Sequence, residues 1–162
     1  MADISSSKLL HIDTGILNAK DACIAIARTE WNAEIVDELE KGCIAKLQHY
    51  SVKKIISFTV PGAFEIPIVV REKARQGNVD AIVALGVILQ GETAHAQHLG
   101  QVVTQALQQI SLEHGVPVIH AVLSLKNEEQ ARKRCLEDEI NRGTEAARAA
   151  VEMANLLAKL RK

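Results

Sequence analysis

Residues 81–99 read AIVALGVILQGETAHAQHL, and this stretch decides the fold. Its first half, residues 81–89, is an unbroken apolar run, which is typical of a strand buried on both faces of a parallel sheet and is too short to span a membrane. The polar segment 90–95 follows at once. Apolar residues then recur at helical spacing, which predicts a helix over about residues 94–113: Leu99, Val102, Val103, Ala106, Leu107 and Ile110.

The junction between this strand and this helix has the features of an anion site. Gly91 permits a tight turn, Thr93 is a good N-cap, and the free N–H groups of a helix start suit an anion. His95 then lies at the carboxyl end of a parallel strand, where open α/β sheets bind ligands. Because imidazole titrates near neutral pH, His95 is the candidate for proton transfer; the alternative is a surface histidine with no role.

Three further apolar runs, residues 22–27, 52–60 and 116–123, predict strands of the same kind. The segments between and after these strands are predicted to be helical. One helix follows Asn32, and three more cover residues 63–74, 127–134 and 141–160. In the first of these helices the charged residues form the stripe opposite the apolar one: Glu34, Asp37, Glu38 and Lys41.

This alternation predicts an α/β protein, a three-layer α/β/α sandwich with a four-stranded parallel sheet, flavodoxin-like in class. Residues 1–162 are expected to form one domain, with the polar residues 1–21 as an N-terminal arm. The carboxyl ends of parallel strands lie along one edge of a sheet. The loops at that edge should therefore bring Trp31, Glu65 and His95 together.

Composition excludes several classes of protein. The net charge of −1, the absence of a basic block and the scarcity of aromatic residues do not indicate a nucleic-acid or membrane-surface partner. No signal peptide and no apolar run of about 18 residues is found, which predicts neither export nor membrane insertion. The odd number and wide spacing of Cys23, Cys43 and Cys135 favour reduced thiols in a cytoplasmic protein.

Each candidate side chain also has a plain structural alternative. His95 and His98 could ligate a metal, but no third ligand is evident, so no metal site is predicted. Trp31 could be packing alone, Glu65 could complement a helix dipole, and Arg134 could belong to a solvated charged face. Their convergence on one edge of the sheet favours a site.

Three blocks of sequence carry a resemblance to a known family. They are VPGAFEIP at residues 60–67, ALGVILQGETAH at 84–95 and NEEQARKR at 127–134, and the spacing between them fits as well. Residues 147–157 are similar to the family's last helix. From about Cys23 to Leu160 the chain resembles the lumazine synthases of riboflavin biosynthesis.

The resemblance implies a condensation of 5-amino-6-(D-ribitylamino)uracil with 3,4-dihydroxy-2-butanone 4-phosphate. An imine forms, phosphate leaves, the ring closes and water is lost, which yields 6,7-dimethyl-8-ribityllumazine. Positioning and proton transfers suffice for these steps, so no cofactor is expected. The resemblance also implies a homopentamer, and it leaves open whether pentamers close into a 60-subunit icosahedral shell.

Carried over by position, His95 is the residue that transfers protons. Glu92 and Thr93 are expected to hold the phosphate, largely through the helix N-terminus, and Arg134 to reach it from the adjacent subunit. Glu145 is a weaker candidate for orienting His95.

The pyrimidine side of the site also follows from the resemblance. Trp31 stands where the family stacks an aromatic ring on the pyrimidine, and Asn32 follows it as expected. The ribityl chain is expected to lie against Ala63, Phe64 and Glu65. Backbone groups are expected to reach the pyrimidine from Val87, Ile88 and Leu89.

This chain departs from the family pattern in several places, among them the segment 135–143. Ala96 replaces the aromatic residue that usually follows the histidine, and Asp138 replaces a usual lysine. His120 occupies a usually apolar or aromatic position that covers the ring from the neighbouring subunit.

Two alternatives stay open. One is the archaeal type of riboflavin synthase, which is similar in fold but takes the lumazine as its substrate. The other is a non-catalytic flavin-binding or shell-forming protein. The intact GETAH string at residues 91–95 favours the synthase that takes a phosphate-bearing substrate.

Overall fold

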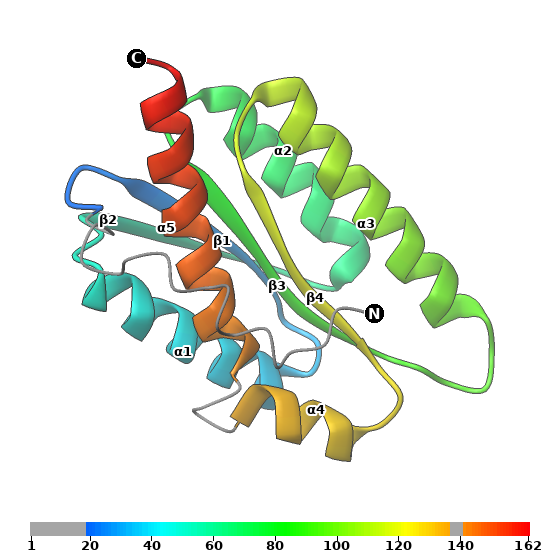
Figure 1. The fold of residues 1–162 in the computed structure, drawn as a ribbon. Coiled ribbons are helices and arrows are strands. Elements are labelled where there is room, and N and C mark those ends of the chain that lie inside the picture. Colours follow the sequence, from blue (N-terminus) through cyan, green and yellow to red (C-terminus); the bar gives the residue numbers. More distant parts are fainter. Residues whose placement is uncertain (1–18, 137–140) are drawn as a thin grey trace.

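Four parallel strands form one sheet in the computed structural model, which describes residues 19–136 and 141–162. They are β1 (Cys23–Thr29), β2 (Lys54–Val60), β3 (Ala81–Leu89) and β4 (Val118–Leu125), in the order β2-β1-β3-β4 (Figure 1). Each neighbouring pair is parallel, as the alternation of strands and helices predicted. The order places β1 and β3 in the middle of the sheet, where both faces are buried.

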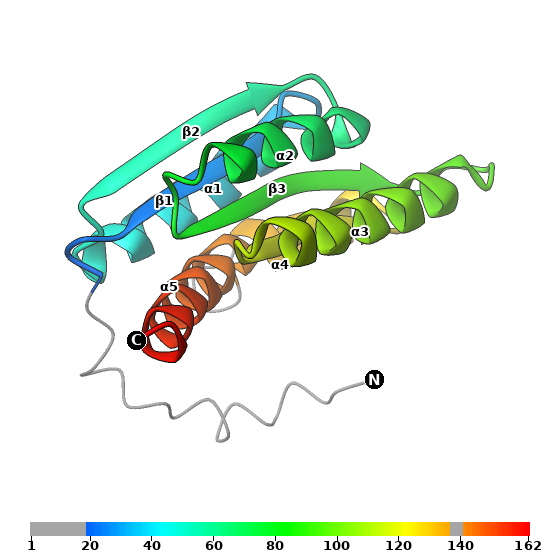
Figure 2. The same cartoon turned by 90° about the horizontal axis from the view of Figure 1, so that it is seen from above.

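Helices cover both faces of this sheet. One face carries α1 (Ala33–His49), α4 (Glu128–Leu136) and α5 (Arg142–Leu160). The other carries the short 3₁₀ helix η3 (Ala63–Glu65), α2 (Ile66–Gln76) and α3 (His95–His114), with α2 and α3 side by side (Figure 2). The predicted three-layer, flavodoxin-like α/β/α sandwich is confirmed.

Alternation along the central strands explains the two hydrophobic cores. In β1, Ile24 and Ile26 face α1 and α5, whereas Ala25 and Ala27 face α2 and α3. Every residue from 81 to 88 is buried, because β3 contributes to both cores. This explains why the stretch that decides the fold is an unbroken apolar run.

Some boundaries differ from the predicted ones for local chemical reasons. β1 continues through Arg28 and Thr29, which the sequence pattern places in the following loop. The predicted helix over residues 63–74 is divided, because Pro67 has no N–H to donate to the Ala63 carbonyl. The Ile66 N–H bonds that carbonyl instead, which closes a 3₁₀ turn ahead of α2.

The predicted N-terminal arm lies outside the described residues except for its last three positions. There Ala19 is buried, and its N–H donates to the Tyr50 carbonyl oxygen at 3.3 Å. Asp138 also lies outside the described residues. Across residues 19–136 and 141–162, no helix combines the length and the apolar character that crossing a bilayer requires.

Candidate functional site

The loops that follow the four strands lie along one edge of the sheet, because all the strands run in the same direction. Trp31 follows β1, Glu65 follows β2, and His95 follows β3. The structure thus places these three side chains at the expected edge. Figure 1 shows that the connection from β3 to α3 extends beyond the other loops of this edge.

Trp31 is held against the chain by its backbone and by a glycine. Its N–H donates to the Pro61 carbonyl at 3.1 Å, and its indole lies over Gly62, where an added Cβ would meet the ring at 2.7 Å. Glu65 accepts the Gly62 N–H at 2.9 Å, which fixes that loop from the other side. The indole is nevertheless 65% exposed, and the neighbouring Phe64 is exposed too. The edge therefore presents two aromatic rings to solvent.

Asn32 connects this loop to β3. It has left-handed backbone angles, φ 61° and ψ 38°, and its side-chain amide donates to the Val87 carbonyl at 3.2 Å. Asparagine tolerates this conformation better than most residues do. The bond sits just beyond the last pairing of β1 with β3, which joins Arg28 to Leu85.

β3 extends past β1 and leaves backbone groups uncovered. The backbone N–H and C=O groups of its even-numbered residues point toward β4. The N–H groups of Ile82 and Gln90, for example, donate to the carbonyls of Pro117 and Leu125. The groups of Ile88 are thus directed into the ladder with β4, which continues to Leu89. Val87 and Leu89 point toward the side that β1 has left. The Val87 carbonyl is bound by Asn32, whereas Leu89 lies four residues past the last pairing with β1 and has no partner in that strand.

The start of α3 differs in detail from the prediction. Glu92, Thr93 and His95 are all exposed, and the helix begins at His95. The N-cap is Ala94, whose side chain cannot accept a hydrogen bond, and not Thr93. The Thr93 hydroxyl accepts the His95 N–H at 3.4 Å. The first-turn N–H groups of a helix lack intrahelical partners, so an anion could bind there.

Arg134 and His120 lie on opposite faces of β4, since the His120 ring bonds Thr104 of α3 while Arg134 belongs to α4 on the face that carries α5. Both line a surface hollow of about 300 Å³ between β4 and α5, here called the β4–α5 hollow. Arg142 and Glu145 also line it, and they form an ion pair at 2.6 Å. Neither Trp31 nor His95 is among the described residues that line this hollow. Arg134 is thus apart from Trp31 and His95 on one chain, whereas His120 also lines a hollow on the α3 face with Ile88 and Gln97.

The hydrogen bonds of His120 determine its protonation. The Val122 N–H donates to Nδ1 at 3.1 Å, so Nε2 carries the proton and donates to the Thr104 hydroxyl at 2.8 Å. That hydroxyl donates in turn to the Gly100 carbonyl at 2.7 Å. Desolvation by the surrounding chain lowers the pKa of His120, which favours the same neutral ring. A neutral imidazole agrees with the expectation, drawn from the resemblance, of an apolar or aromatic residue at this position.

Other predicted residues have simple placements. Ala63 is buried in η3, directly after Gly62, on which the Trp31 indole rests. Ala96 is buried in the core between α3 and the sheet. Among residues 19–136 and 141–162, no three His, Cys, Asp or Glu side chains cluster closely enough to hold a metal ion. The sequence analysis missed Arg28, whose side chain is nearly buried at the end of β1. A pair of acidic residues three positions apart in α1, Asp37 and Glu40, was the available signal.

Comparison with known proteins identifies the family. Residues 21–158 match the model of the family described as 6,7-dimethyl-8-ribityllumazine synthase. A protein of that name from Leptothrix cholodnii is 42% identical over 155 residues, which cover 93% of this chain and 98% of the relative. Proteins of the same name from Pyrococcus furiosus and Thermococcus onnurineus are each 41% identical over 137 residues, or 85% of this chain and 86% and 90% of theirs. The chain therefore belongs to the 6,7-dimethyl-8-ribityllumazine synthase family, as its three sequence blocks indicated.

Proposed function

We propose that this protein condenses 5-amino-6-(D-ribitylamino)uracil with 3,4-dihydroxy-2-butanone 4-phosphate to give 6,7-dimethyl-8-ribityllumazine. The observation that carries the proposal is the family match over residues 21–158. The geometry of the sheet edge agrees with it, because an exposed indole, open strand backbone and a histidine at a helix start lie along that edge. The reaction belongs to riboflavin biosynthesis and makes the protein a transferase.

The pyrimidine binds, in this proposal, beside the Trp31 loop. Trp31 stacks on the ring, and the open backbone of Leu89 hydrogen-bonds its edge, while Asn32 holds Val87 in place. Ala63, Phe64 and Glu65 line the ribityl chain. The exposed rings of Trp31 and Phe64 support this assignment, because large aromatic side chains at an open edge indicate a binding surface.

The butanone phosphate binds at the start of α3. Glu92 and Thr93 contribute mainly through backbone N–H groups, since a carboxylate would repel the phosphate. His95 is then adjacent to the reacting carbonyl and moves protons during imine formation and water loss. Arg134 completes the phosphate site with a charge-assisted contact.

A second copy of the chain supplies Arg134 and His120. The position of Arg134 in the β4–α5 hollow, apart from Trp31 and His95, supports this assignment. Apolar residues exposed around a groove of about 520 Å³ between α2 and α3, among them Ile68 and Val102, would be buried by such a neighbour. The proposed assembly is a homopentamer, and pentamers close into a 60-subunit shell. The three cysteines support a cytoplasmic location.

Incubation of the purified protein with both substrates tests the function. The product's near-ultraviolet absorbance should appear only when both the pyrimidine and the butanone phosphate are present. If the protein instead consumes 6,7-dimethyl-8-ribityllumazine, the archaeal type of riboflavin synthase is the correct assignment. If the protein binds a flavin but turns over neither mixture, the non-catalytic alternative is correct.

Arg134→Ala should weaken binding of the butanone phosphate and leave the affinity for the pyrimidine nearly unchanged. A charge-assisted hydrogen bond is worth about 1.5–3 kcal/mol, which corresponds to a factor of roughly 10 to 150 in the dissociation constant. Calorimetric titration with each substrate measures the two affinities separately. Lys133→Ala is the matched control, because Lys133 is an exposed cation on the same helix outside the β4–α5 hollow. Loss of pyrimidine affinity alone in Arg134→Ala would refute this role.

Sedimentation at moderate salt should show no active monomer, because a single chain holds only half of the proposed site. Pentamers or larger shells should carry all the activity. A species of pentamer mass alone would rule out the shell and keep the shared site. A monomer that retains full activity would rule out the shared site itself.

A further inference from the structure

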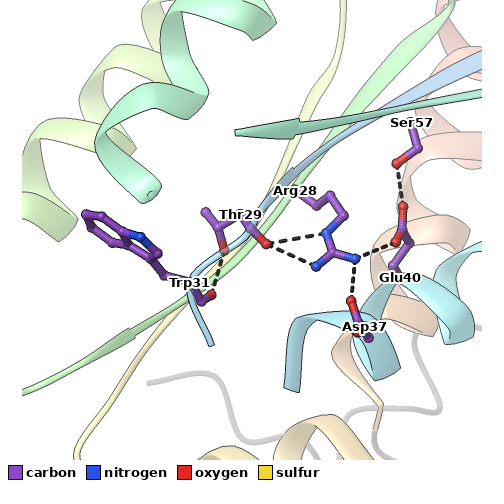
Figure 3. A network of polar contacts seen from close by, with 6 residues as sticks. All are labelled: Arg28, Thr29, Trp31, Asp37, Glu40 and Ser57. Carbon is purple, nitrogen blue, oxygen red and sulfur yellow. Dashed lines mark hydrogen bonds and ion pairs between the residues drawn. The ribbon is translucent and has the colours of Figure 1, made fainter. Parts of the chain in front are cut away.

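Arg28 has an unusual place for an arginine, since its side chain is only 11% exposed at the end of a central strand. On one side its Nη1 binds the carboxylates of Asp37 and Glu40 in α1, the latter at 2.9 Å. On the other side Nε and Nη2 both donate to the Thr29 carbonyl, at 3.3 and 3.2 Å. Figure 3 shows the guanidinium lying between the strand end and α1. The planar fork of arginine thus joins two helical carboxylates to the last carbonyl of β1.

Glu40 extends this network to β2. One of its oxygens binds Arg28, and the other accepts a hydrogen bond from the Ser57 hydroxyl. The Glu40 side chain is 17% exposed, so both of its oxygens are engaged in a largely dry position. Burial lowers the pKa of the Arg28 guanidinium, but Glu40 and Asp37 more than offset this and leave the pKa above its ordinary value. The charge on Arg28 is therefore retained and paired.

Thr29 connects the end of β1 to Trp31 through a hydrogen bond. Its side chain is buried, and its hydroxyl donates to the Trp31 carbonyl at 3.3 Å. The same side chain lies against Gly86 of β3, where an added Cβ would be 3.1 Å from its methyl carbon. Figure 3 shows Trp31 on the opposite side of β1 from Arg28, with Thr29 between them. The bonds that connect Arg28 to Trp31 thus run through Thr29 and the backbone.

The indole itself has few restraints, because it is 65% exposed and rests on Gly62. Its orientation depends on where the backbone of residues 29–32 is held. An apolar side chain at position 28 could fill the space beside α1, but it could not bind the Thr29 carbonyl and two carboxylates at once. Arg28, Asp37 and Glu40 thus hold the end of β1 by hydrogen bonds, immediately before the loop that carries the exposed indole.

We propose that Arg28 is a positioning residue for Trp31, which it holds ready to stack on the pyrimidine before the substrate arrives. The inference rests on the proposed function, since it takes the stacking role of Trp31 from there. Holding a ring in its bound orientation lowers the entropic cost of binding. Arg28 should therefore affect the pyrimidine and leave the butanone phosphate alone.

The test compares Arg28→Met with Arg28→Lys in the assembled protein. Arg28→Met keeps most of the length of the side chain and removes the guanidinium. It should raise KM for the pyrimidine about threefold to tenfold. Both kcat and KM for the butanone phosphate should stay within about twofold of the wild-type values. The fluorescence anisotropy of Trp31, the only tryptophan in the chain, should fall in the absence of substrate. Arg28→Lys keeps the charge without the fork, and it should give intermediate values.

The matched control is Arg148→Met, which removes another half-buried Arg–Glu pair, Arg148 with Glu152 in α5, at a place remote from Trp31. It should lower stability without moving KM for the pyrimidine or the anisotropy of Trp31. If Arg28→Met behaves like this control, the positioning role is overturned. The same holds if both KM values rise equally. Should Arg28→Met not fold, Arg28→Lys decides by the same criteria.

Two measurements that leave Arg28 unchanged separate this inference from the proposed function. Saturating pyrimidine should quench the Trp31 emission, and Trp31→Ala should raise KM for the pyrimidine. If neither occurs, the stacking role of Trp31 fails. If both occur while the Arg28 variants match wild type in KM and anisotropy, only the role of Arg28 fails.

Discussion

His95→Ala should lower kcat by a factor of about 10² to 10⁴, the range for loss of a general acid–base group. His95 is the exposed first residue of α3, next to helix N–H groups that suit a phosphate. Part of the rate should remain, because holding two substrates in reactive geometry supplies much of the acceleration without any proton transfer. Steady-state kinetics with both substrates measures the loss.

His98→Ala is the matched control for this variant. His98 is exposed on the same helix, and its N–H bonds the Ala94 carbonyl at 3.1 Å as an ordinary helical residue. Its substitution should leave kcat within about twofold of wild type, since side chains away from a functional contact rarely matter. Wild-type turnover in His95→Ala, or an equal loss in both variants, would remove the assigned role.

Gly143→Ala should destabilise the fold by about 3 kcal/mol, the upper end of the usual cost of overpacking. A Cβ at Gly143 would lie 1.9 Å from the Leu39 carbonyl oxygen, so α1 and α5 could not keep their present separation. Moving α5 outward would disturb Asn141, whose buried amide donates to the Cys135 carbonyl at 2.7 Å and accepts from the Gly143 N–H at 2.8 Å. The clash therefore has no cheap relief.

Urea denaturation followed by circular dichroism measures this loss. Gly100→Ala is the control, because a Cβ there would meet no described atom within 4 Å. Gly100 lies inside α3, where alanine is favoured over glycine by about 1 kcal/mol. The two variants should thus shift the midpoint in opposite directions. An unchanged midpoint in Gly143→Ala would show that the helices can separate without cost.

The fold could be predicted largely from the sequence, because the relevant signals are local. The apolar run at residues 81–89 indicated a strand buried on both faces, and the alternation with helices indicated a parallel sheet. The split at Pro67 was harder to predict, since it depends on which N–H group reaches the Ala63 carbonyl. Thr93 looked like an N-cap by residue type, yet the helix starts one residue later than such a cap would place it.

The candidate site was predictable only in part. Trp31, Glu65 and His95 were placed at the right edge, because parallel strands end together. Arg28 was missed, since a charged residue after an apolar run resembles the end of a strand. Its burial depends on Asp37 and Glu40, and the stripe pattern assigned Asp37 to the solvated side of α1. Pairing between distant charges is a tertiary property, so the spacing of Asp37 and Glu40 could suggest a partly buried cation but could not identify Arg28 as that partner.

The unequal lengths of β1 and β3 have a consequence for how this edge can change during evolution. Leu89 offers its backbone to the open side because β1 stops pairing at Arg28, and not because of any side chain in β3. Substitutions in β3 that keep its volume would leave these groups in place. An insertion of two residues at the end of β1 would instead cover them, although every residue of β3 stayed the same. At this edge the length of β1 therefore matters more for the exposure of the Leu89 backbone than the identity of the residues in β3.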